Sequence, residues 1–98
     1  MITDADLRNS WPDLAIVVAE LRRIERSEVA DQLVGAVSIA SSSSEILGGV
    51  GVVLRDRRAL RTRLSEPGKR AWNLVIADVH RAYPLSRLRE WWARWIGR

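Results

Sequence analysis

Apolar side chains recur every three or four positions along most of this 98-residue chain, the spacing that places them on one face of an α-helix. Each such run is apolar on one side and polar on the other, as in helices that pack against a common core. We therefore expect five helices, over residues 11–25, 27–40, 42–64, 66–83 and 85–98. The pattern leaves open whether the turn or two before residue 10 is also helical.

Residues that cap helices stand before the first two segments. Ser10 is followed by Pro12 and Asp13, so we expect the Ser10 hydroxyl to cap the helix that begins there, with Pro12 in its first turn. Ser27 stands before the next apolar run and is its expected cap.

The third helix start lies in the stretch SSSSEILGGVG. Ser42 and Glu45 have the spacing of a capping box, in which the Ser42 hydroxyl accepts from the Glu45 amide and the Glu45 carboxylate accepts from the Ser42 amide. Further on, Pro67 is tolerated in the first turn of the fourth helix, and Pro84 ends that helix. These residues are expected to be structural.

Three glycines, Gly48, Gly49 and Gly51, follow the serines and raise the question of a phosphate-binding loop. A P-loop needs a lysine after its last glycine, and a dinucleotide-binding loop needs a third glycine where Leu54 stands. Neither pattern is met. Because a glycine costs a helix interior about 1 kcal/mol relative to alanine, we expect these glycines to mark the close approach of another helix backbone.

A second interpretation of this region remains open. The stretches LVGAVSIA and EILGGVGVVL could be two strands around the serines, since valine and isoleucine favour strands, although the glycines would weaken a strand as well. We favour an all-α fold, a compact bundle of about five short helices in a single domain over residues 1–98. The alternative is an α+β fold with a hairpin around residues 33–54.

The composition argues against most chemistries. The chain has no cysteine, and its one histidine, His80, is expected to be solvated near a helix end rather than to act as a general base. The carboxylate pairs, Asp4 with Asp6 and Glu25 with Glu28, are too few and too local for a hard-cation site. We therefore expect no catalysis, no cofactor and no metal. With no signal-peptide pattern and no run of about 20 apolar residues, the expected location is cytoplasmic.

Charge is distributed unevenly along the chain. Residues 1–50 hold eight acidic and four basic residues, a net charge of −4, whereas residues 51–98 hold four acidic and twelve basic residues, a net charge of +8. Arg57, Arg58 and Arg61 lie in a basic patch near the end of the third predicted helix that could contact phosphates. No helix-turn-helix or other base-reading element accompanies them, so nucleic acid is the less favoured partner.

The C-terminal segment combines tryptophan with arginine. If residues 85–98 are helical, Trp91, Trp92 and Trp95 share one apolar arc of about 140° that no charged residue enters. That face could complete the domain's own core. It could also bind a partner protein or a second copy of the chain, because Trp and Arg are enriched in interface hot spots. A basic helix with a tryptophan face is also typical of helices that lie on a membrane surface.

The order of these features resembles a group of small uncharacterised bacterial helical proteins. The resemblance covers residues 11–83 and lies mainly in the serine-rich helix start Ser43, Ser44, Glu45, Ile46 and Leu47, followed by a proline-started helix that closes in R-A-Y. It implies a compact helical fold and brings no activity and no catalytic residues. The three glycines and the tryptophan-rich tail depart from that pattern.

The sequence therefore predicts a non-catalytic, small helical protein-interaction module that self-associates, for example as a homodimer. The alternative is a peripheral binder of anionic surfaces, either membrane or nucleic acid, through the basic, Trp-rich C-terminal half. In both cases the expected contact residues are Trp91, Trp92, Trp95, Arg57, Arg58 and Arg61.

Overall fold

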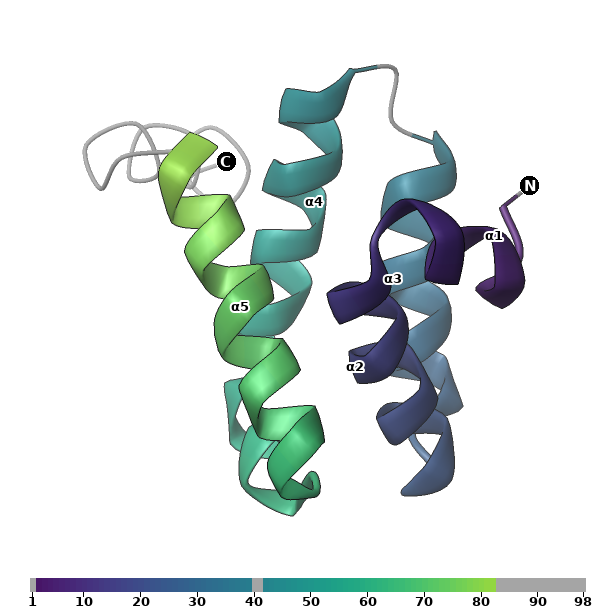
Figure 1. Cartoon of the computed structure of the whole chain (residues 1–98), viewed down its shortest axis with the longest axis vertical. Helices are drawn as coiled ribbons and strands as arrows, with labels where there is room; N and C mark the ends of the chain where they lie inside the picture. Colours follow the sequence, from purple (N-terminus) through teal and green to yellow (C-terminus); the bar gives the residue numbers. More distant parts are fainter. Residues whose placement is uncertain (1, 40–41, 83–98) are drawn as a thin grey trace.

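The computed structural model describes residues 2–39 and 42–82, which form an all-α bundle, as predicted (Figure 1). The hairpin alternative is wrong, because residues 33–39 and 43–54 are helical. The predicted helix over 85–98 and its preceding Pro84 lie outside the described residues. The elements in chain order are α1 (Asp4–Ser10), α2 (Pro12–Arg23), α3 (Ser27–Ile39), α4 (Ser43–Asp56), the 3₁₀ helix η1 (Arg58–Arg63) and α5 (Glu66–Ala82).

The helices enclose one core. α2 packs against α1, α3 and α5, and α4 packs between α3 and α5. α4 and α5 run in opposite directions and are joined by η1 at the end of the bundle away from the start of α4 (Figure 1). The core is built from aliphatic side chains of α1 to α5, and among the described residues Trp72 is the aromatic residue buried in it. The largest fully buried side chains include Leu7, Leu14, Leu21, Leu33, Leu54 and Val75.

α1 begins at a capping box that the sequence analysis did not identify. The Thr3 hydroxyl accepts from the Asp6 amide at 3.1 Å, and the Asp6 carboxylate accepts from the Thr3 amide at 3.0 Å. The prediction that Ser10 caps the next helix is wrong. Ser10 is the last residue of α1, and its hydroxyl donates to the Asp6 carbonyl at 3.0 Å, while Trp11 takes the N-cap position of α2 without a side-chain bond.

The starts of α4 and α5 lie where the sequence places them. The Ser42 hydroxyl accepts from the Glu45 amide at 3.2 Å, which confirms the predicted cap of α4. Pro67 is the second residue of α5. α3 begins at Ser27 itself, since the amides of its first turn donate to the carbonyl of Arg26, so the cap position is one residue earlier than predicted.

The expectation of one helix from the serine run to Leu64 is wrong. α4 ends at Asp56, Arg57 leaves the helical conformation with φ −109° and ψ 21°, and η1 follows. A 3₁₀ helix has three residues per turn, so an apolar side chain every three or four positions still reaches the core. Leu64 is buried and Leu60 is partly buried, which is why the apolar spacing did not reveal the change of helix type.

The glycines of α4 lie between two neighbouring helices. A Cβ atom added to Gly49 would lie 3.2 Å from the Ala36 Cβ and 3.9 Å from the Ala36 Cα, so at Gly49 the backbone of α3 comes close. A Cβ atom added to Gly51 would lie only 2.8 Å from the Val79 Cγ1 of α5. Gly48 is buried as well. The absence of side chains at these positions lets α4 approach both neighbours closely.

Candidate functional site

The larger hollow is an apolar groove of about 610 Å³ at the end of the bundle where α1 meets α2. Its volume lies within the roughly 300–1,000 Å³ of pockets that hold a small ligand or a few side chains. Most of the exposed lining is apolar, and it comes from α1, α3, α4 and α5 and from Trp11 between α1 and α2. The lining residues are Leu7, Ser10, Trp11, Val37, Ile46, Leu47, Asp78 and Arg81, and we call this surface the apolar groove.

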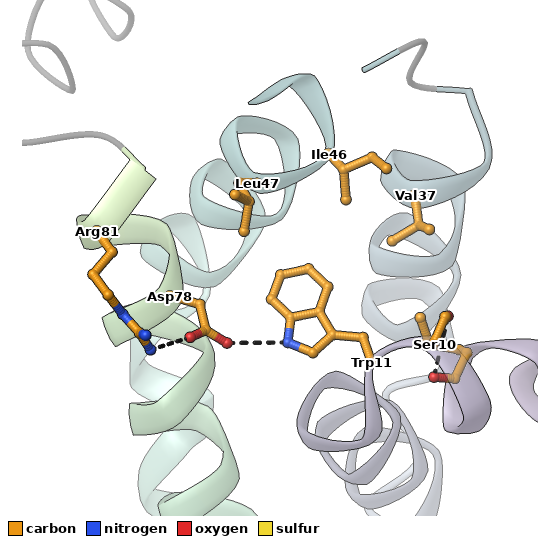
Figure 2. A pocket seen from close by; sticks show the side chains of 8 residues that line it. Ser10, Trp11, Val37, Ile46, Leu47, Asp78 and Arg81 are labelled. Atoms are coloured by element: carbon orange, nitrogen blue, oxygen red, sulfur yellow. Dashed lines mark hydrogen bonds and ion pairs between the residues drawn. The ribbon is translucent and has the colours of Figure 1, made fainter. Parts of the chain in front are cut away.

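Trp11 forms the centre of the groove. Its indole lies below Leu47 and Ile46, and its Nε1 donates to the Asp78 Oδ2 of α5 at 3.3 Å (Figure 2). Arg81 donates to the other carboxylate oxygen of Asp78. The half-buried indole is therefore held by a polar contact at its edge while part of its apolar surface remains open.

The local sequence explains why Trp11 occupies this position. Pro12 disfavours helical geometry at the preceding residue, and Trp11 has φ −146° and ψ 79°. α1 therefore stops and α2 starts anew at this point. Because the helix is interrupted at Trp11, this side chain does not continue the apolar face of either helix. It reaches Asp78 of α5, which lies 67 positions later in the sequence.

The polar groups of the apolar groove are already engaged. The Ser10 hydroxyl donates to the carbonyl of Asp6, and the Asp78 carboxylate accepts from both Trp11 and Arg81. What remains available is aliphatic and aromatic surface, with one ion pair at the rim. Such a surface can take apolar side chains of another molecule.

A second hollow, of about 340 Å³, lies between α4, η1 and α5. Its floor contains buried apolar side chains, and its rim carries three arginines and a histidine. No aspartate or glutamate of the described chain lines it. The lining residues are Gly51, Leu54, Arg55, Arg58, Arg61, Trp72, Asn73, Ile76, Val79 and His80, and we call this surface the basic hollow.

The structure brings together two of the three arginines predicted as contact residues. Arg58 and Arg61 line the basic hollow, whereas Arg57 is exposed at the end of α4 and does not. His80 is exposed, as expected for a solvated histidine. Nothing in the sequence pattern indicated that His80 and Asn73 of α5 would meet the arginines of η1. Trp91, Trp92 and Trp95 lie outside the described residues.

One carboxylate has a strongly shifted pKa and lies away from both hollows. Glu20 of α2 accepts from Arg23 at 3.0 Å and 3.2 Å, and from the Ser65 amide, just before α5, at 2.9 Å. Hydrogen bonds from Arg23 and then from Ser65 lower the pKa of Glu20 from 4.5 to about 2. A Cβ atom at Gly68 would lie 2.7 Å from the Glu20 Oε1, so Gly68 provides the space for this contact.

The described residues contain no group of three or more potential metal-ligating side chains. Within the same part of the chain, every helix is too short or too polar to cross a membrane. No protein-family model, curated protein or solved structure matches this chain.

Proposed function

We propose that this protein is a small, non-catalytic interaction module that self-associates through the apolar groove. The observation that carries the proposal is the half-buried indole of Trp11, which lies in an apolar surface whose polar groups are already paired. Aromatic residues in partly open apolar pockets are typical anchors of protein interfaces.

The rim of the groove favours a second copy of the same chain as the occupant. Dimers with two-fold symmetry use the same surface on both copies, so that surface must be complementary to itself. Asp78 and Arg81 place one negative and one positive charge side by side at the rim. A two-fold arrangement can set the carboxylate of one copy against the guanidinium of the other while the apolar residues of the two grooves meet.

Replacing Leu47 with arginine should dissociate this dimer. The change puts an unpaired charge into the apolar lining, and we expect the dimer dissociation constant to rise at least about tenfold. The measurement is the molar mass of the full chain by light scattering over a range of concentrations, which should show a dimer that L47R shifts to monomer.

The control for L47R is Leu74→Arg. Leu74 is 46% exposed on α5 and does not line the groove, so L74R introduces the same charge elsewhere on the surface. It should leave the dimer intact. A wild-type chain that is monomeric at every concentration, or a dimer that L74R dissociates and L47R does not, would show that the groove is not the interface.

The rival function, binding of anionic surfaces through the basic C-terminal half, predicts different behaviour. Such a protein would co-sediment with anionic vesicles or shift nucleic acid in a gel at low salt, and both effects would weaken steeply as salt is raised. Because the groove has a neutral rim, self-association through it should depend only weakly on salt.

A further inference from the structure

The chain leaves α5 at the edge of the apolar groove. Arg81, in the last turn of α5, lines the groove (Figure 2), and Ala82 is the last residue of the helix. Sixteen residues, 83–98, follow Ala82 in the sequence, and we call them the C-terminal segment. Because this segment is joined to the chain one residue after Arg81, the groove is the nearest apolar surface that it meets on leaving α5.

The C-terminal segment carries the kind of side chain that the groove can bind. Helical spacing in the segment puts Trp91, Trp92 and Trp95 within one apolar arc. The groove offers apolar surface around the half-buried indole of Trp11, and its polar groups are already paired. A tryptophan side chain buries about 150–250 Å² when it packs, and two aromatic rings gain further from edge-to-face or offset contact. The two surfaces are therefore of matching chemistry.

The size of the groove indicates that it forms only part of a dimer interface. Eight residues line it, whereas a specific and stable interface usually takes about 20–30 residues from each partner. Sixteen further residues from the C-terminal segment bring each copy into this range. A dimer that includes the segment is therefore of ordinary size, and a dimer of the two grooves alone is too small.

Two placements of the C-terminal segment have opposite effects on such a dimer. A segment that lies in the groove of its own chain covers the surface proposed for self-association. A segment that lies in the groove of the partner enlarges that surface. In a two-fold dimer the two grooves face each other, so the end of α5 in one copy also lies beside the groove of the other. The second placement is the one that a dimer through the groove allows.

We propose that the C-terminal segment of each copy docks in the apolar groove of the other, with its tryptophans against Trp11. This inference rests on the proposed self-association and names the part of the partner that the groove receives. Each copy gives one segment and receives one, so the arrangement is closed and stops at two chains.

Cross-linking of single-cysteine variants tests the exchange, because the chain has no cysteine of its own. Ser10→Cys places a thiol in the exposed lining of the groove, and Ile96→Cys places one in the C-terminal segment. Each chain then has one thiol, so a link between positions 10 and 96 must join two copies. We expect a flexible bis-maleimide, added to a mixture of the full-length variants, to give this linked pair in peptide mapping by mass spectrometry.

Leu74→Cys is the matched control for the groove position. Leu74 is 46% exposed and does not line the groove, so L74C mixed with I96C should give little product. Adding L47R to the S10C chain should also remove the product. Equal linkage of I96C to L74C and to S10C would overturn the proposal. So would a double variant, S10C with I96C, that links only within one chain, because the segment would then dock on its own groove.

Replacing Trp95 with serine measures the contribution of the tryptophans. Trp95 lies near the middle of the apolar arc, and we expect W95S to raise the dimer dissociation constant at least about tenfold in light scattering. Its neighbour Arg94 lies outside the arc, so R94S should stay within about twofold of the wild type. Circular dichroism checks that both variants are folded, and the cross-link decides the question if W95S is not.

The outcomes separate this inference from the proposed function. A dimer that L47R dissociates, but that lacks the link between positions 10 and 96 and is unchanged by W95S, retains self-association through the groove and overturns the exchange. A wild-type chain that is monomeric at every concentration overturns both.

Discussion

Replacing Gly51 with leucine should lower the free energy of unfolding by about 3 kcal/mol, because no side chain fits between α4 and α5 at this position. Even the first carbon of such a side chain would lie 2.8 Å from the Val79 Cγ1, a distance that real Cβ atoms do not adopt. Val79 is 1% exposed and β-branched, so its side chain has little freedom to move away. Urea unfolding followed by circular dichroism measures the loss.

Alanine at Gly51 gives a finer test. Alanine favours a helix over glycine by about 1 kcal/mol, yet here its methyl group meets Val79, so we expect G51A to destabilise the wild type. In a Val79→Ala background the space is available, and the same change should be neutral or stabilising. A double-mutant cycle between the two positions measures the coupling.

Gly35 of α3 is the matched control, since a Cβ atom there would meet nothing within 4 Å. G35A should therefore raise the free energy of unfolding by up to about 1 kcal/mol. Similar effects of G35A and G51A would contradict the close packing of α4 on α5.

Replacing Glu20 with glutamine should lower the free energy of unfolding by about 2 kcal/mol at neutral pH. The folded protein holds the pKa of Glu20 at about 2, against 4.5 for the free side chain, so folding favours the charged form. A shift of this size corresponds to at most about 3 kcal/mol, and partial exposure of the group reduces it. Glutamine keeps the shape of the side chain and removes the charge.

The effect of E20Q should depend on pH in a defined direction. Because the pKa is lower in the folded state, the stabilisation is fully present above pH 4.5 and is lost as the pH falls towards about 2. The difference between wild type and E20Q should shrink over the same interval. The hydrogen bonds from Thr3 also lower the pKa of Asp6, so the pH dependence of the wild-type stability contains contributions from both carboxylates. The difference in stability between wild type and E20Q contains only the contribution of Glu20.

Glu28→Gln is the control for this series. Glu28 is exposed and forms a 3.4 Å ion pair with Arg26, which is exposed as well. Such surface pairs contribute between 0 and about 1 kcal/mol, so E28Q should change stability little at any pH. A difference between wild type and E20Q that stays constant down to about pH 2 would show that the charge of Glu20 is not what stabilises the contact.

The helices were predictable because their signals are local. The apolar spacing and the Ser42 cap lie within a few residues of the structure they specify. The error at Ser10 arose because two local signals compete. Ser10 has the sequence context of a cap for α2, but the Thr3 and Asp6 box begins a helix that already includes Ser10. That box was visible in the sequence as a threonine followed three residues later by an aspartate.

Neither hollow was predictable, because each joins residues that the sequence does not relate. Trp11 and Asp78 meet across 67 positions, and Arg61 meets Asn73 only because η1 and α5 pack together. The arginines of the basic patch were visible, but an α-helix and a 3₁₀ helix orient them differently. Which of them converge depends on the helix type, and the apolar spacing is compatible with both.

The contact of Glu20 with Ser65 also bears on how the protein folds and unfolds. The principal helix pairs are neighbours in sequence except α2 with α5, and this hydrogen bond spans 45 residues. Closing so long a loop costs more chain entropy than forming the local pairs, so we expect α5 to dock on α2 late in folding. Loss of the Glu20 charge should then accelerate unfolding and leave the folding rate nearly unchanged, which stopped-flow measurements on E20Q can resolve. The charge of Glu20 is therefore expected to affect the unfolding rate of the bundle and not its folding rate.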